Sequence, residues 1–154
     1  MLNQEAVSVL NVLIQTSEDG KKGFGDAAKE ATTTALQTMF RSRADDCAAA
    51  AVELQDLVES LGGKPNDSGT VSGAAHRGWA KVAAVVGDAN LSMLDEVERA
   101  EDTAKAAYTK ALTATLPPQV RLVVQRQHDG AVRNHDLIRD ARNSYRTQKG
   151  AAVH

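Results

Sequence analysis

The sequence has few cysteines, prolines and aromatic residues. Among its 154 residues are one Cys and three Pro, and Phe, Trp and Tyr together make up 3%. A single cysteine excludes an internal disulfide and fits a reducing compartment. No Cys/His cluster has the spacing of a structural zinc site. The opening stretch MLNQEAVSVLNVLIQTSEDG has neither a basic segment nor a continuous apolar run, so we expect no signal peptide and no membrane partner. These absences together predict a cytoplasmic protein.

The formal net charge of -2 is too small to indicate a nucleic-acid or membrane partner. The charge is uneven, however, because the segment from Gln119 to the end has seven Lys and Arg against three Asp. One interpretation is a solvated helix whose basic last turns suit the helix dipole. The other is a surface for an acidic partner or a phosphate backbone. We favour the first interpretation and keep nucleic-acid binding as an alternative.

Helical periodicity extends over nearly the whole chain, and no alternating strand pattern is longer than a few residues. The predicted ends depend on capping residues. Thr33 or Thr34 is the expected N-cap of a second helix, and Gly62-Gly63 followed by Pro65 should end it. Apolar residues then predict four long helices, at 2–31, 34–61, 90–116 and from Pro118 onward.

The remaining capping signals and the joints define the connectivity. Asn90 is the expected N-cap of the third long helix, and Pro118 suits the first turn of the fourth. Short joints make antiparallel neighbours, whereas the long joint should hold its own short helix at 71–86, pinned by Trp79. We therefore predict an all-α antiparallel four-helix bundle with a helix-containing crossover between its second and third helices. It forms one domain over residues 1–148, and residues 149–154 are expected to fray.

Several segments, in this order and spacing, resemble a bacterial ferritin-like family of unknown function over nearly the whole chain. They are EDGKKGF at 18–24, ELQDLVESLGGKP at 53–65, SGTVSGAAHRGW at 68–79, EVERAEDTAKAAY at 96–108, LPPQVR at 116–121 and HDLIRDAR at 135–142. The resemblance implies the four-helix fold and a homodimer. It does not fix an activity, because one scaffold serves many functions.

A di-iron ferritin-like site needs a Glu from each of two helices and a Glu-x-x-His from each of the others. In the second helix Cys47 and Ala50 stand where this motif would lie, and Val132 stands three residues before His135. A complete di-iron site is therefore not expected, and we expect no cofactor. The alternative is a reduced carboxylate and histidine site for iron, manganese or zinc. Its candidate ligands are Glu18, Asp19, Glu98, Glu101 and His135.

Arg43 lies on the apolar stripe of the second helix, one turn before Cys47. A buried guanidinium must be paired, because an isolated buried charge is very costly. Glu101 is the expected partner, and Arg43 would then occupy the space of a metal ion. The competing interpretation has Arg43 reaching solvent from the edge of the stripe. The sequence leaves both open.

No P-loop, nucleophile elbow or dinucleotide fingerprint occurs in the sequence. We therefore expect a non-catalytic bundle that acts as a structural or interaction protein with a degenerate di-metal site. The ferritin-like resemblance implies a stress-related role. A metal-binding protein or oxidase with the reduced site is the first alternative, and nucleic-acid binding through the basic last helix is the second.

Overall fold

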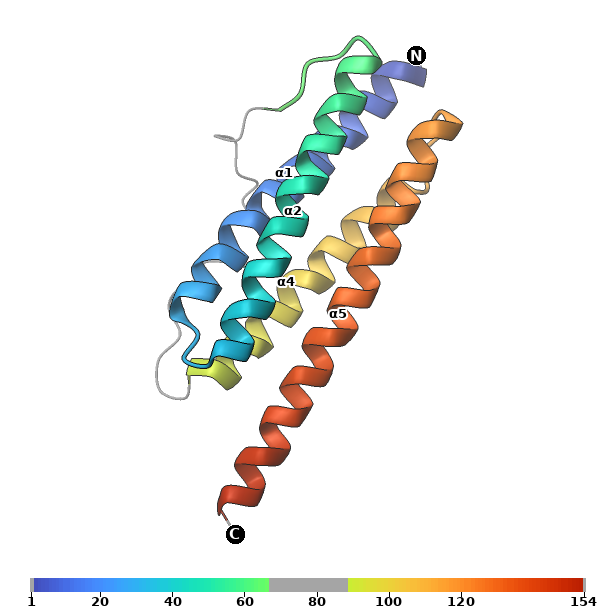
Figure 1. The fold of residues 1–154 in the computed structure, drawn as a ribbon. Helices are drawn as coiled ribbons and strands as arrows, with labels where there is room; N and C mark the ends of the chain where they lie inside the picture. Colours follow the sequence, from blue (N-terminus) through green and yellow to red (C-terminus); the bar gives the residue numbers. More distant parts are fainter. Residues whose placement is uncertain (1, 67–88, 154) are drawn as a thin grey trace.

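A computed structural model describes residues 2–66 and 89–153, and within these ranges the chain is helical and contains no strand. The helices are α1 (Leu2–Glu30), α2 (Thr34–Ser60), α4 (Ala89–Ala111) and α5 (Pro118–Val153) (Figure 1). The all-α four-helix bundle predicted from the sequence is confirmed. The expected crossover helix at 71–86, with Trp79, lies outside the described residues.

Three of the predicted helix ends are confirmed by their capping geometry. The extended Thr33 accepts a hydrogen bond at its Oγ1 from the Leu36 amide at 3.2 Å. Gly62 has a φ of 80°, the left-handed conformation that ends a helix at little cost for glycine. Pro118 is the first residue of α5, where its missing amide hydrogen removes no helical bond.

The third long helix differs from the prediction at both ends. It begins at Ala89, so Asn90 lies inside α4 and is not its N-cap. Asn90 instead donates from Nδ2 to Thr32 Oγ1 at 2.6 Å and accepts the Thr32 amide at 3.1 Å. The helix ends at Ala111 and does not continue to position 116. The Arg121 guanidinium compensates by donating to the Leu112 and Ala114 carbonyl oxygens at 2.9 and 2.6 Å.

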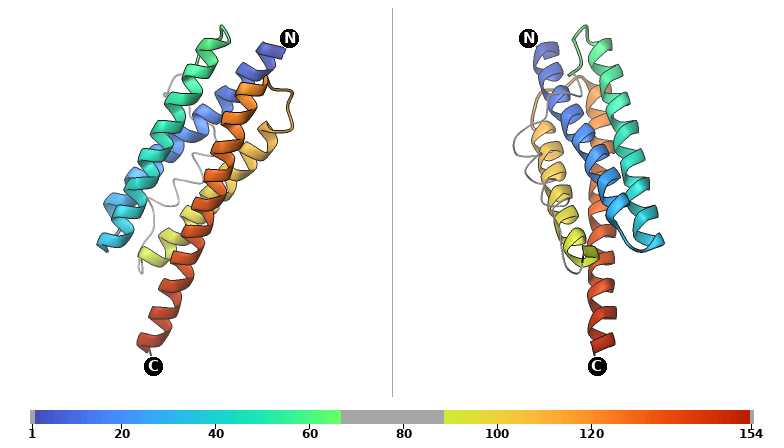
Figure 2. Two further views of the ribbon diagram at one scale, coloured as in Figure 1. Left: turned by 45° about the vertical axis from the view of Figure 1, so that its right-hand side comes forward. Right: turned by 90° about the vertical axis from the view of Figure 1, so that its left-hand side faces the viewer.

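The helices form two tightly packed pairs. Helix α1 packs along α2 and also against α4, and α4 packs along α5, whereas α2 and α5 have few contacts with each other. The 36-residue α5 is the longest helix, and its C-terminal end extends past the other helices (Figure 2). No helix in the described ranges is long and apolar enough to cross a membrane. Helix α5 runs to Val153, so fraying of 149–154 stays a prediction.

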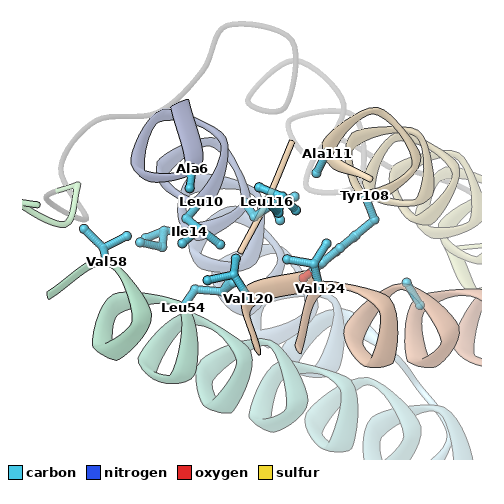
Figure 3. Close-up of a cluster of buried hydrophobic side chains, with 12 residues drawn as sticks. Ala6, Leu10, Ile14, Leu54, Val58, Tyr108, Ala111, Leu116, Val120 and Val124 are labelled. Carbon is cyan, nitrogen blue, oxygen red and sulfur yellow. The ribbon is translucent and has the colours of Figure 1, made fainter. Parts of the chain in front are cut away.

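Two apolar clusters, one toward each end of the bundle, make up the core. The first includes Leu10, Ile14, Leu54, Val58, Tyr108 and Val120 (Figure 3). The second includes Phe24, Phe40, Met93, Leu94, Val97 and Ile138. Every helix contributes to both clusters, so burial of these side chains holds the four helices together at two levels. The segments between the two levels are where buried polar residues gather.

Candidate functional site

A layer of buried polar side chains separates the two apolar clusters. We call it the polar layer, and its members are Gln15, Ser17 and Asp19 of α1, Arg43 of α2, Glu101 of α4 and His135 of α5. Apolar residues in the preceding and following turns of each helix draw these positions inward. Burying a polar group is costly unless it is hydrogen-bonded, and burying a charge is costly unless it is paired. The contacts within the layer therefore decide what it can do.

Arg43 and Glu101 form an ion pair at the centre of the polar layer. Arg43 Nη2 donates to Glu101 Oε1 at 2.6 Å, and the two residues are 9% and 2% exposed. Arg43 Nη1 also donates to Asp46 Oδ2 at 3.2 Å, and the guanidinium carbon lies 5.0 Å from the centre of the Phe24 ring. The guanidinium is thus held between a carboxylate and an aromatic face. Arg43 does not reach from the stripe to open solvent.

Burial and pairing act in opposite directions on this pair. Burial raises the pKa of Glu101, and the adjacent Arg43 guanidinium offsets only part of that rise. Burial by itself lowers the pKa of Arg43, but Glu101, Cys47 and Asp46 together raise it by more, so the net shift is upward. Arg43 is therefore a buried cation, and its guanidinium is the main influence that favours the charged form of Glu101.

Cys47 is a packing residue at the closest approach of α1 and α2. A Cβ atom placed on Gly20 would lie 2.8 Å from Cys47 Sγ, so a larger residue at position 20 would require the Cys47 side chain or the helices to shift. Burial raises the pKa of the Cys47 thiol to about 12, although Arg43 lowers it in part. The neutral thiol lacks the nucleophilic form that catalysis and metal binding require.

His135 and Glu98 are brought together, but in a network of charge pairs at the edge of the polar layer. His135 Nε2 lies 2.9 Å from Asp102 Oδ1 and 3.5 Å from Glu98 Oε1, and its Nδ1 lies 3.1 Å from Asp136 Oδ1. Glu98 also forms an ion pair with Arg142 through its second oxygen. This network joins α4 to α5 and uses the side chains that the metal hypothesis needs.

The other candidate ligands lie elsewhere. Glu18 pairs with the partly exposed Lys21 at 3.5 Å, and Asp19 accepts a hydrogen bond from Gln15 Nε2 at 3.0 Å. Across residues 2–66 and 89–153, no three His, Cys, Asp or Glu side chains are arranged to hold a metal ion. The five candidates are divided among separate contacts with cations and amide donors. The donor set of these described ranges therefore does not fit a di-metal centre.

A second polar chain, missed from the sequence, runs from α4 to α2 through α5. Tyr108 donates to Gln127 Oε1 at 2.9 Å, and Gln127 Nε2 donates to Glu53 Oε1 at 2.8 Å. Arg126 Nη2 pairs with Glu53 Oε2 at 2.5 Å. Burial raises the pKa of Tyr108 to about 12, so its hydroxyl stays a donor. Gln127 is a polar residue on the inward stripe of α5, which is the same signal that identified Arg43.

A cavity of about 710 Å³ occupies the same level of the bundle. All four described helices line it, and the buried part of its wall includes Asp19, Phe24, Arg43 and Glu101. Between α2 and α5 its wall includes the small residues Ala49, Ala50, Gly130 and Ala131 beside longer charged ones such as Glu53, Arg126 and Arg133. The polar layer therefore borders a space that no side chain of residues 2–66 or 89–147 fills.

Comparison with known proteins gives a family but no activity. Residues 5–114, well over half of the chain, match a protein family described as a domain of unknown function (DUF2383). The match includes α1, α2 and α4 with both members of the central ion pair, and it stops before α5 begins. No curated protein matches the chain.

Proposed function

The chain belongs to DUF2383, a family of unknown function, and we propose from its own residues that it is a non-catalytic bundle acting as a structural or interaction protein. The proposal includes the ferritin-like architecture, with a degenerate di-metal site at the polar layer. The observation that carries it is the Arg43–Glu101 ion pair, with 2.6 Å between Nη2 and Oε1. Arg43 is a cation fixed at the position where a ferritin-like site would hold metal.

Simple electrostatics supports this assignment. A divalent ion beside Glu101 would be repelled by the buried guanidinium, and it would have to displace a charge-assisted hydrogen bond. The remaining candidates, Glu98 and His135, are engaged with Arg142 and Asp102. Cys47 offers no nucleophile, because burial raises its thiol pKa to about 12. The polar layer thus has the character of a structural network.

Metal content gives the test. Protein purified without a histidine tag is incubated with Fe(II), Mn(II) or Zn(II), desalted, and measured by elemental mass spectrometry. We expect no stoichiometric metal. About one or two equivalents, lost in Glu101→Ala and retained in Glu59→Ala, would overturn the proposal in favour of a metal-binding protein or oxidase. Glu59 is the matched control because it is an exposed glutamate on α2.

Nucleic-acid binding through α5 is disfavoured, because most arginines of this helix already contact the protein. The residues concerned are Arg121 on backbone carbonyls and Arg126, Arg139, Arg142 and Arg146 on carboxylates. Neutralising a phosphate backbone requires cations that are available to it. A fluorescence anisotropy titration with a DNA duplex at low and high salt should show no specific binding.

The proposal extends to a cytoplasmic homodimer with a stress-related role. Helix α5 exposes two large apolar side chains, Leu122 at 72% and Leu137 at 59%, which a second copy could cover. Sedimentation equilibrium tests the dimer. A monomer at all concentrations would remove this part of the proposal and leave the assignment of Arg43 intact.

A further inference from the structure

The cavity bordered by the polar layer has the properties of a ligand site. Its volume of about 710 Å³ lies within the range of small-molecule pockets, roughly 300–1,000 Å³. Its wall combines the Phe24 ring and alanines of α4 with the buried Arg43 and Glu101. The exposed charged residues Asp46, Arg126 and Arg133 line it as well. A mostly apolar wall with few convergent polar atoms is typical of sites that bind small organic molecules.

Two polar atoms of the central ion pair keep unused hydrogen-bonding capacity. Neither Glu101 Oε2 nor Arg43 Nε makes a hydrogen bond with any residue that the structure describes, and both atoms are inaccessible to solvent. Glu101 is only 2% exposed, and both residues line the cavity. Buried polar atoms in native proteins nearly always have a partner. A molecule in this cavity is therefore expected to accept from the guanidinium and donate to the carboxylate.

The charge of such a molecule follows from the pair itself. Arg43 and Glu101 already neutralise each other across 2.6 Å. The other buried charge in the wall, Asp19, already accepts a hydrogen bond from Gln15. A charged ligand would add a further buried charge to this set, and desolvating an unpaired charge is strongly unfavourable. A hydroxyl or a primary amide offers a donor and an acceptor at adjacent positions without a net charge.

We propose that the cavity binds a small neutral molecule with a hydroxyl or amide group on an apolar body. The polar group contacts Arg43 and Glu101, and the body lies against Phe24, Ala100 and Ala104. Entry is between α2 and α5, where the lining residues Ala49 and Arg133 are exposed. The inference goes beyond the structural role proposed above, because it assigns a ligand to the bundle.

The test is a titration of the full chain with benzyl alcohol and benzamide as neutral probes. Toluene, benzylamine and benzoate are the apolar, cationic and anionic comparisons. Chemical-shift changes of backbone amides report binding, and the melting temperature provides a second readout. We expect saturable shifts at the polar layer with the two neutral polar probes, and affinity about tenfold or more weaker for the three comparisons.

Matched variants locate the binding. Ala104→Leu adds three carbon atoms at a residue that lines the cavity, whereas Ala106→Leu makes the same change at an exposed position of α4. We expect at least about a tenfold loss of affinity in the first variant and none in the second. If Ala104→Leu does not fold, Ala50→Leu fills the cavity from α2.

Three results would overturn the proposal: no saturable binding, equal affinity for toluene or a charged probe, or unchanged binding in the cavity-filled variant. The metal measurement is independent of all three. Stoichiometric metal with probe binding would overturn the structural assignment alone, whereas metal-free protein without probe binding would overturn only the ligand site.

Discussion

Replacing Arg43 by methionine tests whether the polar layer depends on its central ion pair. The substitution keeps an unbranched side chain but leaves the Glu101 carboxylate, 2% exposed, without its cation. Breaking one partner of a buried pair costs about 3–5 kcal/mol. Because a domain is stable by only about 5–15 kcal/mol, this loss is large. Glu101→Gln should be destabilising in the same direction, since it leaves the guanidinium buried and unpaired.

The double variant Arg43→Met with Glu101→Met separates pairing from packing. Replacing both charges by apolar side chains of similar volume is often neutral or stabilising. We therefore expect the double variant to recover most of the loss seen in either single variant. Urea unfolding followed by circular dichroism gives the four free energies of unfolding that the cycle requires. Arg41→Met is the control, because Arg41 is exposed on the same helix, and it should change the midpoint little.

The pH dependence gives a second reading of the same variant. Burial raises the folded-state pKa of Glu101, and removing Arg43 should raise it further. Below the ordinary pKa of 4.5 the carboxyl is protonated in both the folded and unfolded states, so no charge is buried. As pH rises above 4.5, only the folded state holds the proton, and stability falls. The deficit of Arg43→Met should therefore be large near neutrality and shrink toward pH 4.5. Urea midpoints of Arg43→Met and Glu101→Gln that both equal the wild-type midpoint at neutral pH would falsify the pairing argument.

Three further predictions concern packing and reactivity. Gly20→Ala should destabilise the protein because its Cβ would lie 2.8 Å from Cys47 Sγ, and Cys47→Ala in that background should recover part of the loss in thermal unfolding. Gly25→Ala in the same helix meets no atom within 4 Å and should stabilise by about 0.5–1 kcal/mol, so equal effects at both glycines would contradict the packing reason. Gly62→Ala should cost about 1 kcal/mol in urea unfolding, because its φ is 80°. Burial raises the Cys47 pKa to about 12, so iodoacetamide should modify native protein near pH 8 far more slowly than unfolded protein, measured by mass spectrometry.

Local sequence signals predicted the helix ends that local interactions determine. The capping of α2 by Thr33 and Gly62 depends on atoms within a few residues, so the residue types were sufficient. Asn90 was misassigned because its side chain bonds to Thr32, 58 positions away in sequence. The end of α4 was misplaced because Arg121 satisfies the free carbonyl groups from the next helix. Neither long-range bond leaves a periodic signal.

The same distinction applies to the candidate site. The position of Arg43 on an apolar stripe indicated that a buried partner was needed, and the structure places Glu101 there. Stripe positions alone could not show that His135 and Glu98 meet Asp102 and Arg142. Which acidic residue pairs with which cation depends on helix rotation and spacing, and these depend on packing. The volume left between α2 and α5 is a further tertiary property that composition does not reveal.

Two small residues of α2 lie beside both the ion pair and the cavity. At the two positions of α2 where a Glu-x-x-His motif was looked for, the chain has Cys47 and Ala50. Cys47 already approaches Gly20 so closely that a longer side chain would have to separate α1 from α2 or turn into the cavity. Ala50 lines the cavity with a single methyl group, and Arg43 supplies the positive charge beside Glu101. Arg43, Cys47 and Ala50 thus all face the cavity from α2. Introducing Glu at position 47 should therefore disrupt packing against α1 before it creates a metal ligand.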